Sequence, residues 1–114
     1  MKRTQKKKVK IPLYFGELVI LKCKDFKKLN KKYGIELANE WDAAVFRHTT
    51  TEGYTQYFAV FLSKPSIKTI AHEAVHIVNH IFNDRHISLD IFNDEPQAYL
   101  TGWVVEQIDN YFKK

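Results

Sequence analysis

The strongest constraint on the fold is a helical apolar pattern between residues 67 and 82. Apolar residues recur there at three- and four-residue intervals, which is the spacing of one face of an α-helix. Pro65 and Ser66 are helix-start signals, and Asn83 begins a polar stretch, so we expect about five turns of helix. The predicted core-facing stripe consists of Ile67, Ile70, Ala71, Ala74, Val75, Val78, Ile81 and Phe82.

The opposite, polar face of this predicted helix carries His72 and His76. Residues four apart lie one turn apart on the same face, so both imidazoles can reach one metal ion. Glu73 lies beside them, where a carboxylate can take a proton from a metal-activated water. The run 72–76 therefore fits the HExxH pattern of zinc-dependent hydrolases. His80 continues this face by one turn, and we interpret it as a surface or neighbouring residue rather than a ligand.

The candidate third ligand is Glu95, which follows His76 after 18 residues. Asp94 or Glu95 lies near the N-cap of a second predicted helix, and Pro96 falls in its first turn. Two neutral histidines and one carboxylate leave the fourth tetrahedral position of a zinc ion open to water, as in a catalytic site. Asp90 and Asp94 remain alternative ligands. The apolar face of this helix is predicted to consist of Ala98, Leu100, Trp103, Val104, Val105, Ile108, Tyr111 and Phe112.

An HExxH motif followed after 18 residues by Glu resembles the signature of the gluzincin metallopeptidases, the thermolysin and aminopeptidase type. The resemblance covers about residues 65–111. It implies that His72, His76 and Glu95 bind zinc and that Glu73 is the general base. More loosely, the region that starts at residue 93 resembles small zincin-like proteins of bacteriophages and prophages, and this second resemblance implies no substrate.

The chain departs from the larger family at two points. Many gluzincins carry an acidic residue four positions after the glutamate ligand, where this chain has Tyr99. Its phenol can accept an imidazole N–H or donate to the substrate, so we predict a catalytic role for Tyr99. The large enzymes also complete their cleft with a further helical domain. We therefore expect the oxyanion donor to be Tyr99, His80, His86, His48, a backbone amide or a group from another subunit.

Length and composition favour one compact α+β domain. With 114 residues, 45% of them hydrophobic, the chain can bury a modest core. We predict a basic flexible arm over residues 1–10, whose lysines are too polar to pack. Residues 11–114 are predicted to form a minimal zincin-like domain. It combines a small antiparallel or mixed sheet with an active-site helix and a C-terminal helix that bears Glu95.

Local signals predict the remaining elements before the first long helix. Residues 11–24 are rich in strand formers, and Asp25 is placed to cap a short helix over residues 26–33. Gly34 is suited to end that helix. Residues 35–41 are compatible with irregular structure or a brief helix.

The clearest hairpin joins residues 42–50 to residues 54–62 through a turn that contains Gly53. Zincins commonly place an antiparallel edge strand above the metal-binding helix, and we expect residues 54–63 to be that strand. An extended peptide would add to it through main-chain hydrogen bonds. The alternative is an ordinary strand that is paired on both sides.

Charge is distributed unevenly along the chain. Residues 1–32 contain 12 Lys or Arg and two acidic residues, whereas residues 33–114 have a net charge of −5. A basic arm is suited to contact nucleic acid, an anionic membrane or an acidic protein. A solvated or protein-contacting arm is the preferred interpretation, because no aromatic residue is interleaved with the lysines before Tyr14.

Cys23 is the one cysteine in the sequence, so no intramolecular disulfide can form and a reducing cytoplasm is expected. For a phage-encoded protein this is the cytoplasm of the bacterial host. No run approaches membrane-spanning length. The sequence as a whole predicts a zinc-dependent metallopeptidase that acts on a peptide or protein substrate. The alternative is a non-catalytic zincin-fold protein with an assembly, regulatory or protein-binding role.

Overall fold

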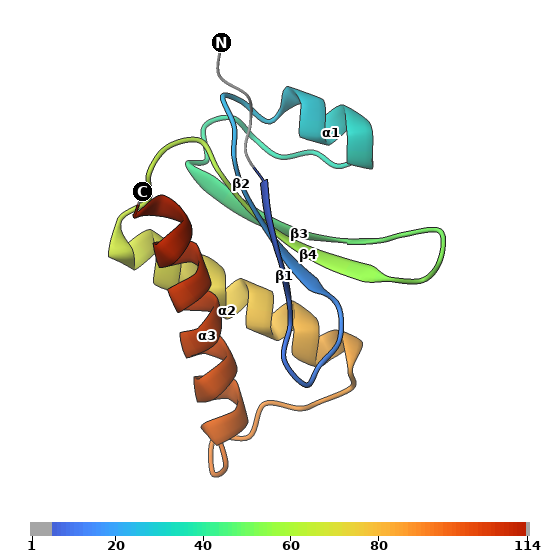
Figure 1. Cartoon of the computed structure of the whole chain (residues 1–114), viewed down its shortest axis with the longest axis vertical. Helices are drawn as coiled ribbons and strands as arrows, with labels where there is room; N and C mark the ends of the chain where they lie inside the picture. The colour runs from blue at the N-terminus through green and yellow to red at the C-terminus, as the bar shows by residue number, and fades with distance from the viewer. Residues whose placement is uncertain (1–5, 114) are drawn as a thin grey trace.

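The computed structural model describes residues 6–113, which form an α+β fold in three layers (Figure 1). A four-stranded mixed sheet has α2 and α3 on one face and α1 on the other. This arrangement confirms the predicted combination of a small mixed sheet with two long C-terminal helices. In chain order the elements are β1 (Lys6–Lys10), β2 (Glu17–Lys22), α1 (Lys27–Tyr33), β3 (Ala43–Thr49), β4 (Thr55–Phe61), α2 (Ile67–Asp84) and α3 (Glu95–Phe112).

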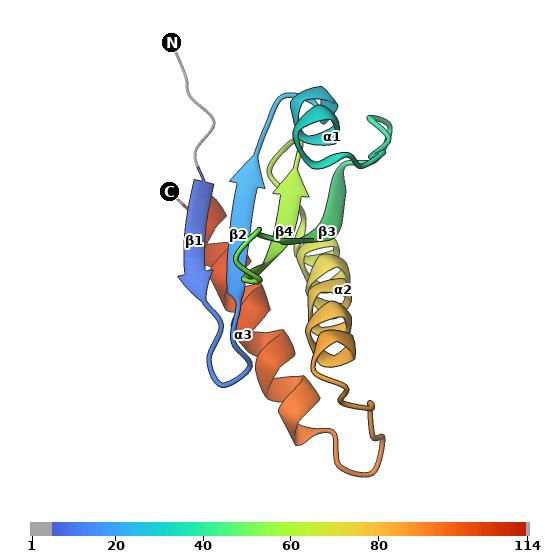
Figure 2. The same ribbon diagram turned by 90° about the vertical axis from the view of Figure 1, so that its right-hand side faces the viewer.

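The strand order in the sheet is β1-β2-β4-β3 (Figure 2). The β3–β4 pair is antiparallel and is the predicted hairpin, whereas β2 and β4 are parallel neighbours. The prediction that residues 54–63 form an edge strand is therefore wrong, because β4 is paired on both sides and β3 forms that edge of the sheet. The physical reason is visible in β4 itself, whose two faces are both apolar, as suits a strand between two cores.

β1 corrects the prediction of a flexible arm over residues 1–10. Residues 6–10 pair with β2 in antiparallel register, with Lys8 opposite Val19. Main-chain hydrogen bonds hold this strand, and an edge strand leaves its lysine side chains in water, where their polarity costs little. Residues 1–5 of the predicted arm lie outside the described residues.

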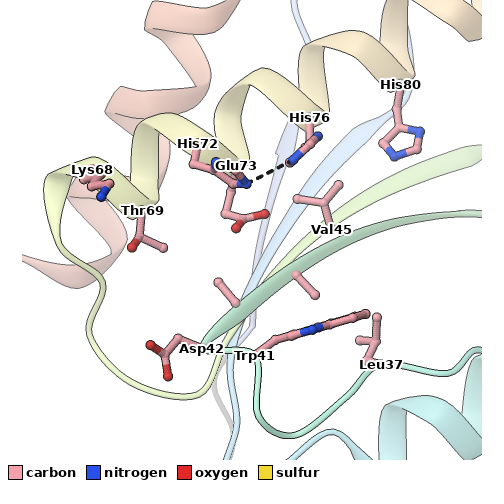
Figure 3. A pocket seen from close by; sticks show the side chains of 12 residues that line it. Leu37, Trp41, Asp42, Val45, Lys68, Thr69, His72, Glu73, His76 and His80 are labelled. Atoms are coloured by element: carbon pink, nitrogen blue, oxygen red, sulfur yellow. Dashed lines mark hydrogen bonds between the residues drawn. The ribbon is translucent and has the colours of Figure 1, made fainter.

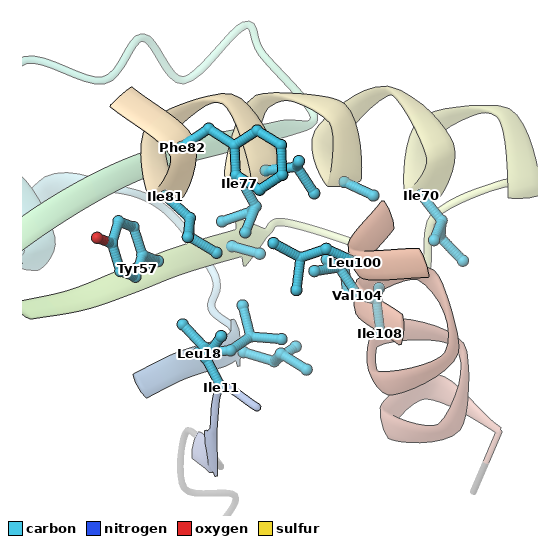
Figure 4. Close-up of a cluster of buried hydrophobic side chains, with 14 of the residues drawn as sticks. Ile11, Leu18, Tyr57, Ile70, Ile77, Ile81, Phe82, Leu100, Val104 and Ile108 are labelled. Carbon is cyan, nitrogen blue, oxygen red and sulfur yellow. The ribbon is translucent and has the colours of Figure 1, made fainter. Parts of the chain in front are cut away.

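The two faces of the sheet bury separate clusters of apolar side chains. Toward α2 and α3 the sheet contributes alternate residues such as Leu18, Ile20 and Tyr57 (Figure 4). Toward α1 it contributes the intervening residues, among them Val19 and Phe58. Alternation with a period of two thus places the residues of β2 and β4 on two buried faces.

The helix boundaries follow the local signals. The Asp25 Oδ1 accepts a hydrogen bond from the Lys27 N–H at 2.9 Å, and Gly34 ends α1 with a left-handed φ of 66°. The Ser66 Oγ accepts from the Thr69 N–H at 3.2 Å at the start of α2. The predicted range of α1 is confirmed within one residue, and α2 extends two residues beyond its predicted apolar pattern, to Asp84. The segment between α1 and β3 contains no helix or strand, so the irregular alternative for residues 35–41 holds.

The buried face of α2 differs from the predicted one. Glu73 and Ile77 are buried, although Glu73 was predicted on the polar face and Ile77 was left out of the stripe. Ile67, Ala71 and Val75 are exposed. The helix is rotated relative to the predicted stripe because it must contact both α3 and the sheet. In α3, Leu100, Val104 and Ile108 are buried as predicted, whereas Ala98 is exposed.

Across residues 6–113, no helix combines the length and the apolar character needed to cross a membrane.

Candidate metal centre and its pocket

His72 and His76 lie one turn apart on α2 and point toward one another, with a hydrogen bond between their Nε2 atoms (Figure 3). Their Nε2 atoms are 3.2 Å apart and their ring centroids are 4.7 Å apart. Two imidazole nitrogens bound to one tetrahedral zinc ion at about 2.0–2.1 Å are separated by roughly 3.3 Å. The pair therefore fits two of the ligand positions of a single ion, as the spacing of the HExxH motif predicts.

Glu73 is the one charged side chain that is buried within residues 6–113, with 7% of its surface exposed. Burial raises the pKa of its carboxyl group above the ordinary value, and the neighbouring His72 and His76 partly oppose this increase. Figure 3 shows the carboxylate directed away from the helix axis toward the side of β3. No hydrogen bond within the described part of the chain engages it, so it is free to accept a proton from a molecule bound nearby.

These side chains line a pocket of about 590 Å³ between α2 and β3. The wall opposite the histidines is formed by the segment before β3, with Leu37 and Trp41, and by the first residues of β3. Sequence analysis left this segment without a role, because no local pattern shows that Trp41 lies across from a helix almost thirty residues later. The lining residues are Leu37, Trp41, Asp42, Ala43, Ala44, Val45, Lys68, Thr69, His72, Glu73, His76 and His80.

Glu95 and Tyr99 are not brought to the histidine pair. Glu95 is the first residue of α3 and is exposed, and Tyr99 one turn later is 77% exposed. Neither lines the pocket. α3 packs against the apolar face of α2, whereas the histidines occupy the face toward β3. Among residues 6–113, no three His, Cys, Asp or Glu side chains converge closely enough to hold a metal ion.

The Asp90 side chain is engaged in local structure, whereas the Asp94 side chain makes no capping hydrogen bond. The Asp90 Oδ1 accepts a hydrogen bond from the Phe92 N–H at 2.9 Å, and Asp94 is the N-cap residue of α3. His86 is exposed with a φ of 59°, and the His48 ring packs on Tyr33 on the α1 side of the sheet. His48, His86, Asp90 and Asp94 are absent from the pocket lining.

His80 does line the pocket, one turn beyond His76. Burial lowers the pKa of its imidazole, and Asp84 opposes this decrease. A neutral imidazole at the end of the pocket can donate or accept a hydrogen bond with a bound molecule, and it is also the form of histidine that binds a metal ion.

A polar contact that sequence analysis missed fixes α2 against the sheet. The Asp84 Oδ2 accepts hydrogen bonds from the Tyr57 hydroxyl at 2.6 Å and from the Arg47 Nε at 2.8 Å. Burial and the Asp84 carboxylate together raise the pKa of Tyr57. Because Tyr57 comes from β4 and Arg47 from β3, this contact sets the position of the helix relative to the strand that borders the pocket.

The raised pKa of Glu73 predicts a pH-dependent effect of Glu73→Gln on stability when a chelator keeps the protein free of metal. A carboxyl group whose pKa is higher in the folded state stabilises the fold below the ordinary Glu pKa. This contribution is lost as the pH rises through the folded-state pKa. Above that pH, the glutamine variant should be more stable than the wild type, and the difference should vanish in acid. Thermal unfolding across the pH range measures it. A glutamine variant that is less stable than the wild type at neutral pH would contradict the inference that Glu73 is buried and charged at that pH.

No protein family, curated protein or solved structure matches this chain.

Proposed function

We propose that the chain is a zinc-dependent peptide hydrolase. The observation that carries the proposal is the 3.2 Å separation of the His72 and His76 Nε2 atoms beside the buried Glu73 carboxylate. A structural zinc site needs the two imidazoles but has no use for that carboxylate, whereas hydrolysis requires a base next to the activated water. The resemblance to gluzincins assigns the same three residues the same roles.

A bound zinc ion would supply the Lewis acidity that activates a water molecule toward a carbonyl. His72 and His76 would hold it through their Nε2 atoms. Glu73 would accept a proton from the water and deliver it to the leaving amine, a transfer that its position in the pocket permits.

The edge strand β3 supports a peptide as the substrate. Ala43, Ala44 and Val45 line the pocket at one end of β3, and β3 is paired through β4 alone. An extended peptide can add to this edge through main-chain hydrogen bonds, which would place it along the pocket. Leu37 and Trp41 offer apolar surface to one of its side chains.

The third protein ligand is the part of the proposal that rests on the resemblance alone. We assign it to Glu95, which requires residues 85–94 to adopt an arrangement that brings the start of α3 to the histidine face of α2. Most of that connection is exposed, but Leu100 and Val104 hold α3 against the opposite face of α2, so the first turn of α3 must unwind for Glu95 to reach the histidines. Asp42 is the other carboxylate in the pocket lining besides Glu73 and provides a matched control.

We predict that Glu95→Ala weakens zinc affinity more than about 100-fold, beyond the effect expected for a residue outside the ligand set. Asp42→Ala should leave the affinity within a few-fold of the wild type. Competition titration against a chromogenic chelator measures both, and one zinc per chain is expected for the wild type. The reverse ranking of the two variants would identify Asp42 as the ligand and exclude Glu95.

A non-catalytic protein-binding role is the second candidate function. It is favoured by the absence of an assembled group of three ligands within residues 6–113. It is also favoured by exposed apolar side chains near the connection between α2 and α3, such as Ile91 and Phe92, which is 92% exposed. A zinc-loaded wild type that binds metal tightly but cleaves no member of a diverse peptide mixture would favour this role.

A further inference from the structure

The lysines of β1 project to the side of the sheet that α1 covers. Lys6 is opposite Leu21 and Lys8 is opposite Val19, and both partners belong to the apolar cluster beneath α1. Directly opposite residues of an antiparallel pair point to the same face, and alternation places Lys10 there as well. The three lysines are exposed and form a row along this edge of the sheet.

α1 extends this row with further lysines. α1 covers the same face of the sheet, and partial burial together with the positive charges of Lys32 and Lys8 lowers the pKa of Lys6. Lys28 lies one turn from Lys32 on the same side of the helix. We call the set Lys6, Lys8, Lys10, Lys28 and Lys32 the basic surface.

No acidic side chain within residues 6–113 forms an ion pair with the basic surface, because the ion pairs there join Arg47 to Asp84 and Lys113 to Asp109. The nearest carboxylate on the same sheet face, Glu17, accepts a hydrogen bond from the Gln56 Nε2 at 2.8 Å. The basic surface therefore gathers five positive charges from two elements, against which Glu17, opposite Lys10 in the β1–β2 register, sets a single negative charge. Such an arrangement stabilises a bound polyanion at the cost of mutual repulsion in its absence.

We propose that the basic surface binds the phosphate backbone of nucleic acid without sequence preference. Lysines on one face of a strand are spaced by roughly 6.7 Å. This is about two steps of the 3.4 Å phosphate repeat along one strand of a duplex. The β1 lysines thus form a linear row, which matches a backbone better than a point-like anion. This inference is independent of the proposed hydrolase activity.

A lipid surface matches the same residues less well. Stable membrane attachment through a basic surface combines the charges with apolar side chains or a lipid anchor. Four of the exposed apolar residues lie around the β1–β2 turn and the α2–α3 connection, at the opposite end of the sheet from α1, where Lys10 is the one residue of the basic surface that is close to them in sequence (Figure 2). That end also carries Asp90 and Asp94, which anionic lipids would repel. These apolar residues are Leu13, Phe15, Ile91 and Phe92.

The test is fluorescence anisotropy of the full chain with a labelled DNA duplex and a labelled single strand of mixed sequence. We expect binding whose logarithmic affinity falls linearly with the logarithm of salt concentration. The triple variant K8Q/K10Q/K32Q should bind at least about tenfold more weakly at low salt and reduce the salt slope by about 3. The variant K64Q/K68Q/K113Q removes the same charge from exposed positions outside the basic surface and should bind like the wild type.

Two results would overturn the proposal. An equal loss in both triple variants would indicate a general effect of net charge rather than a defined surface. Failure of the wild type to bind either oligonucleotide would also exclude it, whether or not the chain binds vesicles that contain phosphatidylserine. Circular dichroism of both variants checks that the sheet is intact, and the substituted side chains are exposed, so we expect unchanged spectra.

Discussion

A zinc-loaded Glu73→Gln chain should hydrolyse peptides at least about 100-fold more slowly than the wild type while it binds zinc with similar affinity. The amide keeps the shape of the side chain but cannot accept the proton from water. His72 and His76 are unchanged, so the metal should be retained. Initial rates on a quenched fluorescent peptide mixture, together with zinc content, separate the two effects.

Asp42→Asn is the matched control for this experiment, because it makes the same carboxylate-to-amide change at another residue of the pocket lining. It should retain most of the activity. Full turnover in the Glu73 variant would remove the carboxylate from the mechanism. An equal loss of hydrolysis rate in both variants would mean that the rate depends on the total negative charge of the pocket and not on Glu73 as a specific base.

Two substitutions on α2 test which face of this helix packs into the core. Ile77→Ala should destabilise the protein by about 2–5 kcal/mol, because Ile77 is fully buried between the helix and the sheet and its loss leaves a cavity. Val75→Ala, on the same helix, should change the free energy of unfolding by about 0.5 kcal/mol or less, since Val75 is 43% exposed. Urea unfolding monitored by circular dichroism measures both.

The two helix variants also test the orientation of the candidate site. If Val75 proved to be the costly position, α2 would be rotated toward the predicted stripe. Glu73 would then lie on the solvent side and not in the pocket. A large effect at Ile77 alone supports the helix orientation that places Glu73 and the histidines beside β3.

The features that the sequence predicted well are those encoded within one helical turn or one hairpin. Ser66 and Gly34 mark helix ends because each satisfies backbone groups of its own neighbours. The approach of His72 to His76 follows from a four-residue spacing alone. The hairpin between β3 and β4 needed only a short turn between two apolar runs.

The features that were missed depend on contacts between distant segments. The position of β4 inside the sheet depends on its pairing with β2, which is about 39 residues earlier in the register that joins Glu17 to Gln56. The pairing of residues 6–10 rests on main-chain hydrogen bonds that lysine side chains do not reveal. Whether Glu95 reaches the histidines depends on which side of α2 the second helix packs against, and no spacing rule determines that side.

The two edges of the sheet have unequal chemistry. β1 ends the sheet with four lysines among its five residues, so an identical strand from another molecule would meet strong repulsion there. β3 carries Arg47 as its one permanently charged side chain and lies beside the pocket. The β3 edge is therefore the edge that can pair with a strand of another molecule. Once two molecules have paired through β3, each has used that edge, so strand-to-strand association of this protein should stop at a pair of molecules and not continue into fibres.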